Sequence, residues 1–170
     1  MSATTVGSKI RQRPTVMPHG PSETPYEGGV RTPIMISWPG KITPRMDTEH
    51  LASTIDLWPT IASLVGTDCP KDLPGINLTN DDAVQKRSTV FGEQYNHDIA
   101  DVDDPTRSLE HRWVIDGYWK LIAPDNRNLP DDNTELYDLR HDPNEENDLA
   151  SSDGQRVESL LSKLNVWWKP

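Results

Sequence analysis

The strongest candidates for chemistry lie in one stretch of the sequence, NHDIADVDDP. His97 stands beside Asp98, and three more aspartates follow at Asp101, Asp103 and Asp104. Carboxylate oxygens can cage a calcium ion, but the stretch lacks the sixth-position glycine of an EF-hand loop, so we favour a solvated loop over a metal site. His97 is the residue that we predict to contact a substrate. Its imidazole can donate to an alcohol oxygen or pair with Asp98.

The remaining candidates for chemistry are weaker. Cys69 is the only cysteine, which excludes a disulfide within the chain, and nothing beside it would activate a nucleophile. Asp125-Asn126 has the form of a metal-binding pair after a strand, but the surrounding sequence DNRNLPDDN favours a surface turn. Asn77 begins an Asn-Leu-Thr glycosylation sequon, which has meaning only in a eukaryotic secretory context.

The first half of the chain has the pattern of α/β structure. Residues 1–23 carry polar and basic side chains without a hydrophobic period, which predicts a disordered lead-in. After Gly28-Gly29, the apolar run from Ile34 to Trp38 predicts a strand that is buried on both faces. We therefore interpret residues 24–86 as the end of an α/β domain, at the edge of a mostly parallel sheet.

A helix is expected near the middle of that half. Residues 51–55 have an extended pattern, and apolar residues then recur at helical spacing over residues 57–65. Asp56 is placed to cap the helix N-terminus, and Gly66 is a natural stop at its C-terminus. Residues 69–86 are predicted to form a polar connection.

Residues 87–170 predict a small antiparallel sheet packed by a helix. The stretches STVFGEQY, RWVIDGYWKLI and TELYDL are rich in aromatic and β-branched residues, and Asp116-Gly117 is a hairpin signal. The predicted fold class is therefore α/β with an α+β C-terminal subdomain. One apolar helical stripe would cover the sheet, formed by Val157, Leu160, Leu161, Leu164 and Trp167.

The composition limits the class of partner. The formal net charge of −10 argues against binding to nucleic acid or to an anionic membrane. No apolar run of about 18 residues suggests a membrane span, and the N-terminus lacks the apolar segment of a secretory signal. The cellular compartment is left open.

Residues 24–42, TPYEGGVRTPIMISWPGKI, closely resemble the second signature region of the type I sulfatases. These are the arylsulfatase-like members of the alkaline phosphatase superfamily. Further blocks resemble the same family in the same order, namely STIDLWPTIASLVG, LPGINL, DGYWKLI and TELYDLRHDPNEENDLA. The resemblance extends from about residue 25 to the C-terminus, and it implies the end of the large α/β domain followed by the small four-stranded subdomain.

The resemblance also implies hydrolysis of sulfate esters. In the family, a formylglycine made from the first residue of a C/S-x-P-S-R motif is the nucleophile, and calcium held by aspartate and asparagine side chains acts as a Lewis acid. Neither part is found in this sequence. Cys69 is followed directly by proline, and Asp125-Asn126 lies downstream of the signature instead of upstream. Ser22 stands where relatives often have a sulfate-binding lysine.

We therefore expect the C-terminal portion of an arylsulfatase-like sulfuric ester hydrolase, inactive alone, with calcium and formylglycine supplied in the complete enzyme. The alternative is a non-catalytic binding or interaction module derived from a sulfatase. In resembling sulfatases the loop that would contain His97 leans over the mouth of the active-site cleft and helps to select the leaving group. An unpaired sheet edge in the first half would favour self-association.

Overall fold

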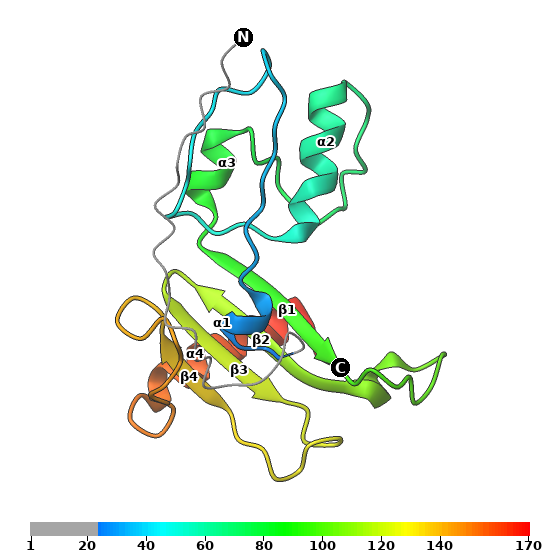
Figure 1. The fold of residues 1–170 in the computed structure, drawn as a ribbon. Helices are drawn as coiled ribbons and strands as arrows, with labels where there is room; N and C mark the ends of the chain where they lie inside the picture. Colours follow the sequence, from blue (N-terminus) through cyan, green and yellow to red (C-terminus); the bar gives the residue numbers. More distant parts are fainter. Residues whose placement is uncertain (1–23) are drawn as a thin grey trace.

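The computed structural model describes residues 24–170, so the predicted lead-in of residues 1–23 lies outside the described residues. At the centre is a four-stranded antiparallel sheet whose spatial order is the order of the chain (Figure 1). The predicted antiparallel sheet is confirmed. Its strands are β1 (Thr89–Tyr95), β2 (Leu109–Asp116), β3 (Trp119–Pro124) and β4 (Glu135–Asp138).

One face of the sheet is covered by helix α4 (Gly154–Trp167), as the apolar stripe predicts. Leu160 and Leu164 are buried against Val114 and Leu121. The Asp153 side chain accepts a hydrogen bond from the Arg156 backbone at 3.1 Å and so caps the N-terminus of the helix. Near the other end, the Trp167 ring stacks on Phe91 with 5.1 Å between ring centroids.

The opposite face of the sheet is more polar. Strand alternation and register place Lys120 there, opposite Ile115 of β2 and Tyr137 of β4. The short helix α1 (Glu27–Val30) lies in front of this face, while α4 lies behind the sheet (Figure 1). The two faces are therefore covered by elements from opposite ends of the described chain.

Two local features shape the sheet. The predicted β2–β3 hairpin is present, but Asp116 pairs with Trp119 and the two turn residues are Gly117 and Tyr118. Gly117 has a φ of 60°, a conformation that favours glycine. A register shift between Gln94 and Tyr95 marks a bulge where β1 ends. Bulges commonly re-aim the chain at the edge of a sheet, and the loop that contains His97 begins just after this one.

The first half contains helices and extended chain. After the 3₁₀ turn η1 (Thr54–Asp56) come α2 (Leu57–Val65) and α3 (Asp81–Lys86), which lie beyond one end of the sheet (Figure 1). Helix α2 and its left-handed stop at Gly66 confirm the prediction. Helix α3 lies within residues 69–86, which were predicted to be a connection. No helix within residues 24–170 combines the length and apolar character needed to cross a membrane.

Two predicted extended segments differ from the structure. Residues 34–38 pair with no strand among the described residues, and Met35 is 87% exposed. Residues 51–53 are unpaired, and residues 54–56 form η1. A strand buried on both faces needs neighbours on both sides, and residues 24–170 supply none at this place.

Asp56 also acts differently from the prediction. It precedes α2, but its side chain does not cap that helix. Its carboxylate instead accepts hydrogen bonds from the backbone of Ser53 and of Ile76, both at 2.8 Å, and lies 2.5 Å from the Arg87 guanidinium. Asp56 is fully buried, so it ties η1 to two later segments of the chain.

Candidate functional site

His97 lies two residues beyond the end of β1, in an exposed loop. The bulge turns this loop toward the start of β2, where the Asn96 backbone donates to the Ser108 carbonyl at 2.7 Å. The Asp125 backbone likewise donates to the Glu110 carbonyl at 2.7 Å, which brings the turn after β3 alongside. Two loops therefore meet at one end of the sheet.

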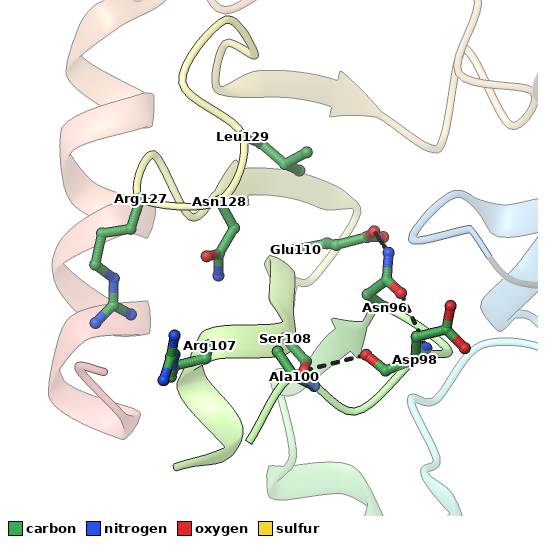
Figure 2. A pocket seen from close by; sticks show the side chains of 9 residues that line it. All are labelled: Asn96, Asp98, Ala100, Arg107, Ser108, Glu110, Arg127, Asn128 and Leu129. Atoms are coloured by element: carbon green, nitrogen blue, oxygen red, sulfur yellow. Dashed lines mark hydrogen bonds between the residues drawn. The ribbon is translucent and has the colours of Figure 1, made fainter.

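A hollow of about 470 Å³ lies between these two loops. Figure 2 shows Arg107 and Arg127 together at one end of it, with Asp98 and Glu110 toward the other. His97 follows Asn96, which does line the hollow, but His97 itself is not among the lining residues. Its predicted contact with a substrate stays a prediction. The complete lining is Asn96, Asp98, Ala100, Arg107, Ser108, Glu110, Arg127, Asn128 and Leu129.

The two arginines are each paired with an aspartate. Arg107 Nη1 lies 3.1 Å from Asp101, and Arg127 makes a two-pronged contact with Asp125. The hydrogen bond from Arg127 holds the pKa of the Asp125 carboxyl below its usual range. Both arginine side chains remain more than half exposed. A ligand that binds either guanidinium group would have to compete with the paired aspartate.

The other end of the hollow presents oxygen acceptors and amides. Glu110 accepts hydrogen bonds from the side chains of Gln94, at 3.1 Å, and Asn96, at 3.0 Å. The Ser108 hydroxyl accepts from the Ala100 backbone at 2.8 Å and so fixes the intervening loop. These groups suit the hydroxyl groups of a neutral ligand, which both donate and accept hydrogen bonds.

The charged side chains that line the hollow are balanced, with Arg107 and Arg127 against Asp98 and Glu110. Both arginines are already paired with aspartates outside the lining, Asp101 and Asp125. A sulfate group would have to compete with these two carboxylates for the guanidinium groups. The hollow therefore favours the alcohol part of a ligand over an anionic group.

The aspartates of the loop serve the loop itself. The Asp101 carboxylate accepts from the Asp103 backbone at 3.0 Å, and that bond, followed by Arg107, lowers the pKa of Asp101. Asp104 caps the 3₁₀ turn η2 (Pro105–Ser108) through the Thr106 backbone. Such bonds are typical of a self-supporting polar turn.

Residues 24–170 contain no group of three or more metal-ligating side chains arranged to hold an ion. Asp125 is buried against Arg127 and is not free as a ligand, while Asn126 is exposed. The donor set of this part of the chain therefore does not fit the calcium site that the resemblance implies for a complete enzyme.

Sequence reasoning missed a buried charged cluster beneath α1. Lys120 is fully buried, with its Nζ 2.8 Å from Glu145 Oε1 and 3.4 Å from Glu27 Oε1. The Glu27 backbone also donates to Glu145 Oε2. Burial raises the pKa of the Glu145 carboxyl, and Lys120 opposes that rise. A lysine inside the apolar run YWKLI was the available signal, because an unpaired lysine is almost never fully buried.

A second polar contact flanks the cluster. Glu135 accepts hydrogen bonds from the hydroxyl groups of Tyr26, at 3.1 Å, and Tyr137, at 2.8 Å. Burial, reinforced by this carboxylate, raises the pKa of both tyrosines. Both phenols therefore stay neutral donors at physiological pH.

Comparisons with known proteins give a consistent result. The family described as "N-sulphoglucosamine sulphohydrolase, C-terminal" matches residues 23–166. A sulfatase of Formosa agariphila is 31% identical over 154 residues, and an N-acetylgalactosamine-6-O-sulfatase of Bacteroides thetaiotaomicron is 27% identical over 149 residues. These matches cover 84% and 82% of this chain, but only 27% of either relative.

A solved structure agrees in fold. It comes from work on glycosaminoglycan metabolism by Bacteroides thetaiotaomicron, and it superposes with a TM-score of 0.58 at 25% identity. The match covers 85% of this chain and 30% of the other. The chain thus spans between a quarter and a third of the length of the proteins that it matches.

Proposed function

This chain belongs to the sulfatases, and from that premise we propose that it is the C-terminal part of a sulfuric ester hydrolase. The observation that carries the proposal is the family match over residues 23–166, a region that lies at the C-terminus of sulphoglucosamine sulphohydrolases. The remaining length of the relatives would supply the nucleophile and the calcium ligands. The chain alone should then be inactive.

We assign to residues 87–170 the role of contacting the alcohol part of the ester. The hollow beside the loop of His97 offers hydroxyl-binding groups, and both of its arginines are already paired with aspartates, which disfavours the sulfate itself. Loops held at the end of a rigid sheet are where such selectivity usually resides. Since the family description and the name of the Bacteroides thetaiotaomicron relative both refer to amino sugars, we propose a sulfated sugar as the ligand class.

Residues 24–86 have a different role in this proposal. Their exposed apolar side chains, including Met35, Trp58 and Ile61, would pack against the rest of an α/β domain. In the isolated chain the same surface would favour self-association. The division at residues 86 and 87 is part of the proposal, although Arg87 reaches back across it to Asp56.

The first test is activity. The purified chain should not hydrolyse a small aryl sulfate or a sulfated sugar, even with added calcium. Turnover that appears equally in a mock preparation lacking the chain would be contamination. Turnover that follows the chain through every purification step would overturn the proposal.

The alternative is a non-catalytic module that binds a partner or a sulfated ligand. The two functions separate at the DNA level, because a coding sequence upstream of Met1 with an in-frame C/S-x-P-S-R motif favours the hydrolase. An upstream sequence without that motif favours the binding module, and sugar binding by the isolated chain would then be measured directly.

His97 is tested in a complete enzyme that carries this chain. We expect His97→Ala to lower kcat/KM for the natural sulfate ester at least tenfold, on the order of 1.4 kcal/mol, while sparing a small aryl sulfate. His111→Ala is the matched control, because His111 is bonded to Gln94 within the sheet. Equal effects of His97→Ala on both substrates would remove His97 from the substrate contact.

A further inference from the structure

The cluster of Glu27, Lys120 and Glu145 joins segments that are distant in the sequence. Glu27 lies 93 residues from Lys120 and 118 residues from Glu145. Local structure cannot bring such residues together, so the fold itself must hold them. All three side chains are at least nine-tenths buried, which makes any unpaired charge among them costly.

The same three residues come from the blocks that carry the family resemblance. Glu27 belongs to PYEGGV, Lys120 to DGYWKLI and Glu145 to HDPNEENDLA. Tyr26 and Glu135, which are bonded to each other at 3.1 Å, add a second contact between the first of these blocks and β4. The most recognisable parts of the sequence therefore meet at one place in the structure.

The backbone around the cluster is adapted to this contact. Glu145 has a φ of 57°, and it is the one residue other than glycine with a positive φ within residues 24–170. This conformation favours glycine, yet a glutamate occupies it and directs its carboxylate at Lys120 and at the Glu27 backbone. Gly29 is equally constrained, because an added Cβ would lie 2.2 Å from the Thr24 carbonyl oxygen.

Glu27 is poorly placed for acid or base chemistry on a substrate. It is 7% exposed, and its carboxylate faces Lys120 and Arg31. It does not line the hollow near the loop of His97. The carboxylate of Glu27 is thus used for contacts inside the protein.

We propose that Glu27, Lys120 and Glu145 form a clasp that fastens the signature segment, residues 24–31, to the sheet. The three sequence blocks that contain these residues then mark a joint between the two halves. We expect the clasp to be separable from the core, because the leucines packed by α4 include Leu121, which alternates with Lys120 and therefore lies on the other face of the sheet. Opening the clasp should release the segment while the sheet persists.

Amide hydrogen exchange on the 170-residue chain tests the clasp. Lys120→Met keeps the length of the side chain and removes the buried cation that Glu27 and Glu145 share. We expect the amides of residues 27–31 to exchange at least tenfold faster, while those of Val114 and Leu121 change by less than threefold. Lys163→Met is the matched control, since Lys163 is paired with Asp116 outside the cluster. It should leave residues 27–31 unchanged.

A second variant keeps the test decisive if Lys120→Met fails to fold. Glu27→Gln leaves Lys120 paired with Glu145 and alters no residue of the sheet. It should accelerate the same amides, and Glu146→Gln, at an exposed neighbour of Glu145, should not. Unchanged exchange at residues 27–31 in Glu27→Gln would overturn the clasp. Equal acceleration in the segment and in the sheet would also overturn it, because the cluster would then be part of one core.

Discussion

The largest fully buried side chains are mostly apolar in residues 87–170 and polar in residues 24–86. In the second half, Leu109, Val114 and Leu121 are fully buried. In the first half, Asp56 and Thr60 are fully buried, while Trp58 is 58% exposed. The second half is therefore ordered by apolar packing and the first by hydrogen bonds, and the apolar side chains of the first half remain available to another surface.

The contrast is clearest in how each half is tied together. Leu164 of α4 packs into a cluster that spans β2, β3 and β4. Thr60 of α2 instead accepts a hydrogen bond from the Leu78 backbone at 2.8 Å, and Asp56 accepts from Ile76. Loss of a leucine should therefore weaken the second half most, and loss of a charge the first.

Leu164→Ala should have the largest effect. The side chain is fully buried, so its truncation should lower the free energy of unfolding by about 2–5 kcal/mol. Urea unfolding followed by circular dichroism measures the change. Val166→Ala, at a site 86% exposed on the same helix, is the control and should stay within about 0.5 kcal/mol. Equal losses in the two variants would contradict an apolar core beneath α4.

Asp56→Asn should act on the first half. It removes the charge that faces the nearly buried Arg87 and should cost about 1–3 kcal/mol of local stability. Hydrogen exchange should accelerate at Ser53 and Ile76, whose amides donate to Asp56, and not at Val114. Asp72→Asn, at an exposed site, is the control. Uniform, high protection of both halves before mutation would break the comparison itself.

Lys163→Met should show how little surface charge contributes to the second half. The pair with Asp116 is partly exposed, so its loss should cost about 1 kcal/mol or less. Burial alone would raise the pKa of Asp116, but the bonds from Lys163 and Thr89 lower it. The stabilisation that the ionised Asp116 carboxylate gains from Lys163 is thus present above pH 3.8, and it is lost as the pH falls through the lowered pKa of Asp116.

The Lys163–Asp116 pair should therefore make the stability of the protein depend on pH. Between pH 7 and pH 3, the urea midpoint of the unchanged protein should fall further than that of Lys163→Met. An identical fall in both proteins would show that Lys163 does not set the pKa of Asp116.

Replacing apolar residues on α2 should change stability least. Trp58 and Ile61 are at least half exposed, so a double change to glutamine should alter the free energy of unfolding by no more than about 0.5 kcal/mol. The monomer fraction in sedimentation velocity should nevertheless rise, because the apolar surface is reduced. Val166→Gln is the control on α4. An equal rise of the monomer fraction in that variant would show that the chain does not self-associate mainly through its first half.

The two halves also differ in how well the sequence predicted them. The hairpin signalled by Asp116-Gly117 and the stripe of α4 were predictable because turn chemistry and helical spacing are local signals, although the turn itself is at Gly117 and Tyr118. The structure of residues 34–38 was not predictable in this way, because an apolar run indicates a buried strand only where neighbouring strands exist.

The site was predictable in part for a similar reason. A loop after the strand ending at Tyr95 followed from the pattern, whereas the hollow needed the turn after β3 to lie beside that loop. The clasp joins Glu27 to Lys120 and to Glu145, which lie 93 and 118 positions further along the chain. No spacing rule connects residues so far apart. Lys120 alone, placed within an apolar strand, carried a hint of it.

The order of the strands in the sheet has a consequence for how the molecule assembles. Each strand pairs with its neighbour in the sequence, and a two-residue turn connects β2 to β3, so the sheet forms without closing any loop that spans most of the chain. The contact between Glu27 and Glu145 closes a loop of 118 residues, which costs more chain entropy. Because contacts that are local in sequence form faster, we expect the sheet to appear first during refolding. The signature segment would then dock only after the sheet has formed.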